Sequence, residues 1–175
     1  MVVQNDTLFL RISEDKGQRG LFVAKRSAGL LLYRRRVEAL EVFLVHPGGP
    51  FWAKKDLGAW TIPKGEYAEG EEPLDAARRE FMEETGFATP SNAVALGEVK
   101  QAGGKIVVAW AAEGDCDPDR LASNVCSIEW PPRSGKMMEI PEVDRGAWFT
   151  SEAAREHILK SQQPFLERLA GILSA

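Results

Sequence analysis

Short apolar runs separated by charged or glycine-rich turns dominate this chain, and they predict more strands than helices. Residues 28–35 and 40–46 are two such runs with a charged turn between them, a pattern typical of an antiparallel strand pair. Residues 131–144 are polar and are predicted as a loop. The other predicted strands or extended pieces cover residues 8–12, 60–63, 95–101, 105–114, 127–130 and 145–150.

Helical periodicity is found over residues 73–85, 151–159 and 164–173. The first of these segments begins at Pro73, where a missing N–H costs nothing, and Gly86 is typical of the residue that follows a helix. The order of strands and helices predicts an α/β fold in which a mixed β-sheet is sandwiched between helices (α/β/α). No internal repeat or interdomain linker divides the chain.

Negative charge is concentrated in residues 65–87, which contain eight acidic and two basic residues. The whole chain has a net charge of −4, so the residues outside this segment carry +2. An acidic patch on a slightly basic body suits a metal cation together with an anionic ligand. A nucleic-acid partner is not expected, because a large footprint on nucleic acid needs a broad basic face.

The remaining composition favours a cytoplasmic protein without a membrane partner. Two cysteines are too few for a disulfide scaffold or a zinc cluster. The N-terminal residues lack the pattern of a secretory signal, and no apolar run approaches the ~18 residues of a membrane span. Both a monomer and a homodimer agree with the sequence.

Three carboxylates of the 73–85 helix share one face by the i, i+3, i+4 rule, namely Glu80, Glu83 and Glu84. An apolar stripe about a quarter-turn away would pack on a sheet, and it consists of Leu74, Ala77 and Phe81. Hard divalent cations take oxygen ligands, commonly carboxylates together with water and phosphate. The helix therefore predicts a site for Mg²⁺, with Mn²⁺ as the alternative.

The spacing of this segment matches a known motif. Gly65, Glu71 and residues 79–87 fit G-x5-E-x7-R-E-U-x-E-E-x-G-U, where U is apolar, at every defined position. The segment resembles the Nudix box, and the strand-rich pattern around it resembles the Nudix fold over residues 25–175. Residues 1–24 lie outside the resemblance and are expected to be an N-terminal extension.

The resemblance implies Mg²⁺-dependent hydrolysis of a nucleoside diphosphate that is linked to another moiety. Transferred position by position, the residues of the metal site would be Gly65, Glu80, Glu83 and Glu84. Arg79 would orient a carboxylate by a charge-assisted hydrogen bond, for which Glu71 is the candidate. Glu80, Glu83 and Arg79 are therefore predicted catalytic residues.

Glu139 and Glu142 are further catalytic candidates. Nudix enzymes often use an additional carboxylate from a distal loop, as a metal ligand or a general base, and both residues precede a predicted strand. A solvated acid in a loop explains either residue equally well.

Four residues near the box are candidates for substrate binding. Lys64 precedes the box glycine, and similar Pro-Lys-Gly stretches in Nudix hydrolases of diadenosine and diphosphoinositol polyphosphates place the lysine on phosphate. Lys54 and Lys55 would contact a polyphosphate tail, although a plain exposed loop explains them equally well. Among the tryptophans, Trp52 is the least easily explained by packing and is a candidate for stacking on a base.

These observations favour a pyrophosphohydrolase whose small-molecule substrate is a nucleoside polyphosphate, either a dinucleoside polyphosphate or a nucleoside triphosphate. Two alternatives stay open. One is an RNA 5'-end pyrophosphohydrolase, and the other is a non-catalytic Nudix domain that senses a nucleotide. Substrate choice in this fold depends on loops outside the box.

Overall fold

The two most continuous apolar runs form neighbouring strands in the middle of a sheet. The structure is a computed structural model and describes residues 25–37 and 39–175, so the strand predicted at 8–12 and the extension at 1–24 lie outside the described residues. Strands β1 (Arg26–Arg35) and β2 (Leu40–Pro47) are antiparallel, as predicted, and Tyr33 pairs with Val42. Runs of this kind are typical of strands that are covered on both faces.

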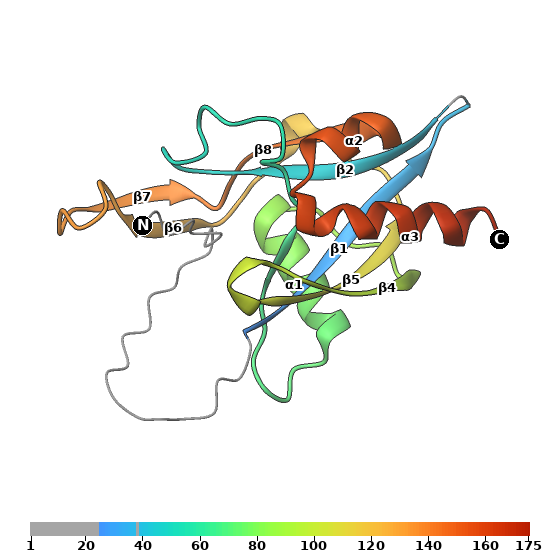
Figure 1. Cartoon of the computed structure of the whole chain (residues 1–175), viewed down its shortest axis with the longest axis horizontal. Coiled ribbons are helices and arrows are strands. Elements are labelled where there is room, and N and C mark those ends of the chain that lie inside the picture. Colours follow the sequence, from blue (N-terminus) through green and yellow to red (C-terminus); the bar gives the residue numbers. More distant parts are fainter. Residues whose placement is uncertain (1–24, 38) are drawn as a thin grey trace.

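The main sheet has six strands in the order β4-β5-β1-β2-β8, and β3 also pairs with β1 (Figure 1). The pair β1–β5 is parallel and the other pairs are antiparallel, so the sheet is mixed, as the sequence predicts. The remaining strands of the main sheet are β3 (Lys64–Glu66), β4 (Ala93–Lys100), β5 (Ile106–Glu113) and β8 (Val143–Thr150). Strands β6 (Val125–Glu129) and β7 (Met137–Pro141) lie outside this sheet.

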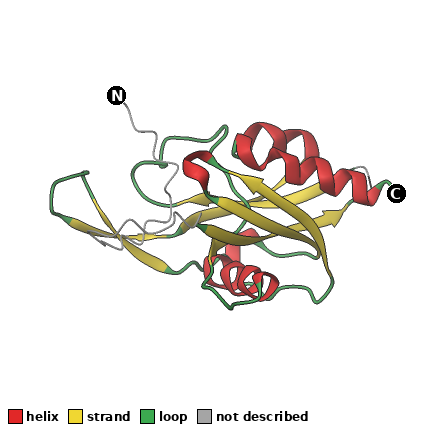
Figure 2. Cartoon of the chain, turned by 60° about the horizontal axis from the view of Figure 1, so that its bottom comes forward, coloured by secondary structure: helices red, strands yellow, loops and turns green. Residues whose placement is uncertain are grey.

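Helices cover both faces of this sheet (Figure 2). Helix α1 (Pro73–Thr85) packs on β1, β3 and β5, whereas α2 (Ser151–His157) packs on β2 and β8 and α3 (Gln163–Leu173) on β4. The predicted α/β/α arrangement is therefore confirmed. None of the described helices is long and apolar enough to cross a membrane.

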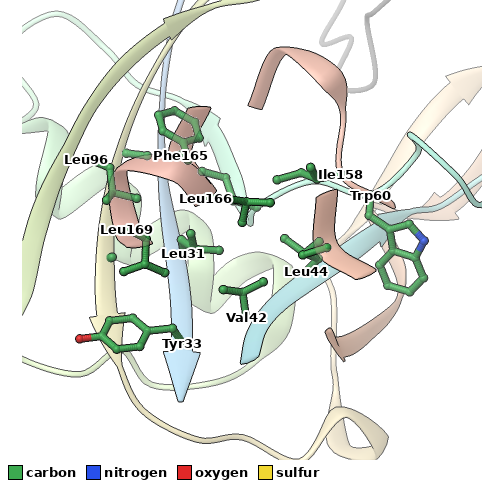
Figure 3. Close-up of a cluster of buried hydrophobic side chains, with 14 of the residues drawn as sticks. Leu31, Tyr33, Val42, Leu44, Trp60, Leu96, Ile158, Phe165, Leu166 and Leu169 are labelled. Carbon is green, nitrogen blue, oxygen red and sulfur yellow. The ribbon is translucent and has the colours of Figure 1, made fainter. Parts of the chain in front are cut away.

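Alternating side chains of β1 fill two separate cores, because successive residues of a strand point to opposite faces. Leu30 and Leu32 pack in the cluster that contains Phe81 of α1. Leu31 and Tyr33 pack in the other cluster, which contains Phe165, Leu166 and Leu169 of α3 (Figure 3). The first cluster fixes α1 on the sheet, and truncating the fully buried Phe81 to alanine would cost about 3–5 kcal/mol.

The predicted loop over residues 131–144 is wrong from residue 137 onwards, where two strands form. Strand β7 pairs with β6 as a separate two-stranded hairpin, in which Glu139 faces Ser127, and β8 begins earlier than predicted, at Val143. The hairpin extends away from the main sheet (Figure 1). Its residues are mostly exposed or half-buried, so no buried apolar run distinguished them from a loop in the sequence.

Candidate active site

Helix α1 has the limits that its end signals predict. It begins at Pro73 and ends at Thr85. The next residue, Gly86, has a φ of 76°, the left-handed conformation that favours glycine, and its N–H donates to the Met82 carbonyl at 2.8 Å. The apolar side of the helix, with Ala77 and Phe81, is buried against the sheet. This packing presents the carboxylate side of the helix to strand β3, with which α1 is in contact.

Glu84 is the most deeply buried carboxylate of the helix, with 0% exposure. Its Oε2 accepts a hydrogen bond from the main-chain N–H of Lys64 at 2.9 Å. Its Oε1 is buried and has no hydrogen-bond partner among the described residues. Burial raises the pKa of Glu84 well above its usual range, because water no longer solvates the charge.

Glu80 is 8% exposed, and its carboxyl group lies against the box glycine. A Cβ atom on Gly65 would overlap this carboxyl group, so the contact requires glycine. Burial raises the pKa of Glu80, the ion pair with Arg79 opposes that shift, and the nearby charges of Glu83 and Glu142 add to it. The structure therefore places Glu80 within a cluster of carboxylates.

Arg79 supplies the positive charge that this crowded segment requires. Its Nε and Nη2 donate to the two carboxylate oxygens of Glu71 at 2.9 and 3.2 Å, which is the contact expected from the sequence. Its Nη1 donates to Oε1 of Glu80 at 2.6 Å and to Oε1 of Glu83 at 3.4 Å. The hydrogen bonds from Arg79 lower the pKa of Glu71. One guanidinium thus links three of the acidic side chains.

The residues of this cluster fit a hard divalent cation by their chemistry. Within residues 25–37 and 39–175, no three Asp, Glu, His or Cys side chains are already arranged as a metal site, since Arg79 pairs with Glu80 and Glu83. The buried, unpartnered oxygen of Glu84 is nevertheless an acceptor that lacks a donor, and carboxylate oxygen is the ligand that Mg²⁺ and Mn²⁺ prefer. The metal-binding roles of these residues stay predictions.

The two distal glutamates lie in different surroundings. The negative charge of Glu142, between β7 and β8, raises the pKa of both Glu80 and Glu84, which shows that Glu142 lies near the box carboxylates. Glu139 lies in β7 and not in a loop, so that part of its prediction is wrong. It is exposed and faces Ser127 across the hairpin.

Main-chain hydrogen bonds that the sequence did not reveal hold Glu142 relative to α1. The N–H of Asn124 donates to the carbonyl of Glu83, and the carbonyl of Asn124 accepts from the N–H of Glu142, both at 2.9 Å. Just before Asn124, the N–H of Ala122 donates to the Thr85 carbonyl at 3.0 Å. No side-chain pattern signals these contacts, because all of them are made by the backbone.

Lys64 is the predicted substrate-binding residue that lies closest to the carboxylates. It is 5% exposed in β3, and burial lowers the pKa of its ammonium group, with a contribution from Lys105 and with Glu84 and Glu80 opposing. Lys54 and Lys55 are exposed in the loop after β2. The ammonium of Lys55 lies 3.4 Å from the centroid of the Phe51 ring.

Packing does explain Trp52, contrary to the expectation from its loop position. The side chain is 8% exposed and belongs to the core cluster beside α2 and α3. Its indole N–H is buried and has no hydrogen-bond partner among the described residues. Stacking of Trp52 on a base stays a prediction.

The fold and the box on α1 define a Nudix-type domain. The NUDIX domain family matches residues 23–169, and the chain belongs to this family. The recognition of the family from the box sequence is therefore confirmed.

Individual proteins resemble the chain in a short segment or in the fold. An RNA pyrophosphohydrolase of Bartonella bacilliformis is 70% identical over 28 residues, which are 16% of this chain and 16% of that relative's length. A Caenorhabditis elegans Ap4A hydrolase in a binary complex has a TM-score of 0.60 at 22% identity, over 86% of this chain and 98% of the other. The NUDIX domain of Shewanella oneidensis NrtR, complexed with ADP ribose, has a TM-score of 0.58 at 18% identity, over 86% and 89% of the two chains. At these identities the solved structures show a shared fold alone.

Proposed function

We propose that this chain is a Nudix pyrophosphohydrolase that cleaves a pyrophosphate bond in a nucleoside polyphosphate, either a dinucleoside polyphosphate or a nucleoside triphosphate. The observation that carries the proposal is the fully buried carboxylate of Glu84 with one unpartnered oxygen. A buried carboxylate oxygen without a hydrogen-bond donor is costly, and a bound cation would remove that cost. The box sequence and the family membership support the same activity.

Glu80, Glu83 and Glu84 would hold Mg²⁺ or, as the alternative, Mn²⁺, and Gly65 gives the carboxyl of Glu80 room to pack. When bound, the cation would neutralise charge on the phosphate oxygens and would lower the pKa of a water molecule. Arg79 would orient the carboxylates of Glu80 and Glu83 by its hydrogen bonds to them. Its two hydrogen bonds to Glu71 fix the guanidinium beside the site.

The hydrolysis itself requires an attacking water molecule and an acceptor for its proton. The water oxygen forms a bond to one phosphorus, and the bridging oxygen leaves with the electron pair of the broken P–O bond. Glu142 is our candidate for the proton acceptor because its charge acts on both Glu80 and Glu84. Lys64 would contact the phosphates, since its ammonium interacts electrostatically with Glu84 and Glu80.

A substrate panel tests this function. Diadenosine polyphosphates, nucleoside triphosphates, sugar nucleotides and diphosphoinositols are each incubated with the protein and Mg²⁺, and the products are identified by mass. We expect turnover of the first two classes, and a loss of about 100-fold or more in Glu83→Gln with an unchanged circular dichroism spectrum. Absence of turnover on the whole panel would overturn the proposal.

Hydrolysis of RNA 5' ends is a second candidate because of the 70% identity with the RNA pyrophosphohydrolase, which extends over only 28 residues. A 5'-triphosphorylated oligoribonucleotide in the same panel separates the two activities. Nucleotide binding without turnover would instead identify a sensing domain. The domain limits 25–175, the cytoplasmic location and the choice between monomer and homodimer stay predictions.

A further inference from the structure

Three strands bring lysine residues together at the end of the sheet where β1 begins. Strand β3 pairs there with β1, so that Lys64 is opposite Gly29, and β5 pairs with the other edge of β1. The N–H of Ile106, the first residue of β5, donates to the carbonyl of Lys25 at 3.0 Å. Lys25, Lys64 and Lys105 are therefore neighbours, although the sequence separates them widely. Figure 1 shows the turn between β4 and β5 beside the start of β1.

Two of these ammonium groups share a single acceptor atom. The Nζ of Lys105 lies 3.4 Å from Oε1 of Glu66, and the Nζ of Lys25 lies 3.7 Å from the same oxygen. One carboxylate carries one negative charge, so this trio keeps a net charge of +1. The side chain of Lys105 is only 18% exposed, which reduces the solvation that would otherwise screen its charge.

Lys64 connects this positive group with the carboxylates of α1. Its ammonium interacts electrostatically with Lys105 and Glu66 and also with Glu84 and Glu80. A chain of phosphates that starts at the box carboxylates and passes Lys64 would next meet Lys105. Ammonium groups bind phosphate oxygens as point charges, and such charge-assisted hydrogen bonds are among the strong ones.

We propose that Lys105 and Lys25 form, beside Lys64, a subsite for phosphates that lie beyond the bond being cleaved. This subsite selects chains of three or more phosphates over diphosphate derivatives. The inference rests on the proposed function, which places the cleaved bond at the box carboxylates, but the binding of a phosphate chain can be measured without turnover. It names linear oligophosphates as the class of substrate.

Equilibrium binding of inorganic tripolyphosphate and pyrophosphate tests the subsite directly. We expect Lys105→Gln to weaken tripolyphosphate binding about tenfold or more in calorimetry, and pyrophosphate binding by less than about twofold. Lys105→Arg keeps the charge and restores tripolyphosphate binding. Glu66→Gln releases both lysines from their shared acceptor and strengthens tripolyphosphate binding.

The matched control is Lys100→Gln, which removes the same charge from an exposed residue of β4 near the same end of the sheet. Equal tripolyphosphate affinities of Lys105→Gln and Lys100→Gln, with both variants folded by circular dichroism, would overturn the subsite. In an active enzyme, Lys105→Gln raises the KM for a tri- or tetraphosphate substrate and leaves that for ADP-ribose unchanged. If the wild type hydrolyses nothing, the proposed function fails while the binding result still decides the subsite.

Discussion

The main-chain N–H of Lys64 donates a hydrogen bond to Oε2 of Glu84 at 2.9 Å. This contact joins β3 to α1 at a carboxylate that is wholly buried. It also places Gly65, the next residue of β3, against the carboxyl of Glu80. These two contacts fix the position of β3 relative to the last turns of α1. A metal site needs ligands that are held rigidly in this way.

Substitution of Glu84 by glutamine tests the proposed role of this carboxylate in metal binding. The neutral side chain keeps the volume and still accepts from the N–H of Lys64, but it removes a buried charge whose second oxygen has no partner among the described residues. We expect Mg²⁺ affinity and turnover to fall by about 100-fold or more. Mg²⁺ should also raise the melting temperature of the wild type more than that of Glu84→Gln, because a ligand stabilises the folded state according to its affinity.

Calorimetric titration with Mg²⁺ and thermal unfolding with and without chelator check both halves of this expectation. Asp75→Asn is a suitable control, because Asp75 is an exposed carboxylate in the first turn of the same helix. Unchanged Mg²⁺ affinity in Glu84→Gln would remove Glu84 from the metal site.

Gly65→Ala is expected to reduce activity through Glu80. The added Cβ would overlap the carboxyl group of Glu80, which must then move away from its position beside Arg79. We expect turnover to fall by about 10-fold or more, an effect comparable to loss of a residue that orients a ligand. Gly171→Ala provides the control, since a Cβ there meets no atom within 4 Å and the residue lies in α3. Equal activities of the two variants would show that the close approach at Gly65 is not required.

Local patterns predicted the parts of this molecule that local physics determines. The limits of α1 follow from Pro73 and Gly86, and its two faces follow from helical periodicity. The contact between Arg79 and Glu71, which the resemblance to the Nudix box implied, is also confirmed. Strands β1 and β2 were also predicted from local sequence, since short continuous apolar runs are typical of strands that are buried on both faces.

Contacts between distant segments were not predictable in the same way. Trp52 lies in a loop rich in glycine and proline, yet its side chain is buried in a core cluster that also contains Ile158, from the far end of the chain. The meeting of Lys25 and Lys105 at Glu66 depends on the pairing of β1 with both β3 and β5. Neither arrangement leaves a periodic signal in the sequence.

The two distal glutamates provide a matched pair for identifying the additional carboxylate. Glu142 acts electrostatically on Glu80 and Glu84, whereas Glu139 is exposed on the β6–β7 hairpin. We expect Glu142→Gln to lower kcat by about 10²–10⁴-fold, the usual contribution of a general base, with little change in KM. Glu139→Gln should stay within about twofold of the wild type. Steady-state kinetics over a range of pH check this, and equal losses would contradict the assignment of Glu142.

Cys116 is expected to make stability sensitive to alkaline pH. Burial raises the pKa of its thiol to about 12, with Asp115 adding to the shift and Arg34 opposing it. Because the folded pKa exceeds the unfolded value of about 8.5, the contribution to stability is complete below that value and is lost as pH rises towards about 12. Urea unfolding at about pH 8 and pH 10.5 should show a larger loss for the wild type than for Cys116→Ser. Equal losses would contradict this, and alkylation of Cys116 at about pH 8 should require unfolding, since the thiolate is the nucleophile.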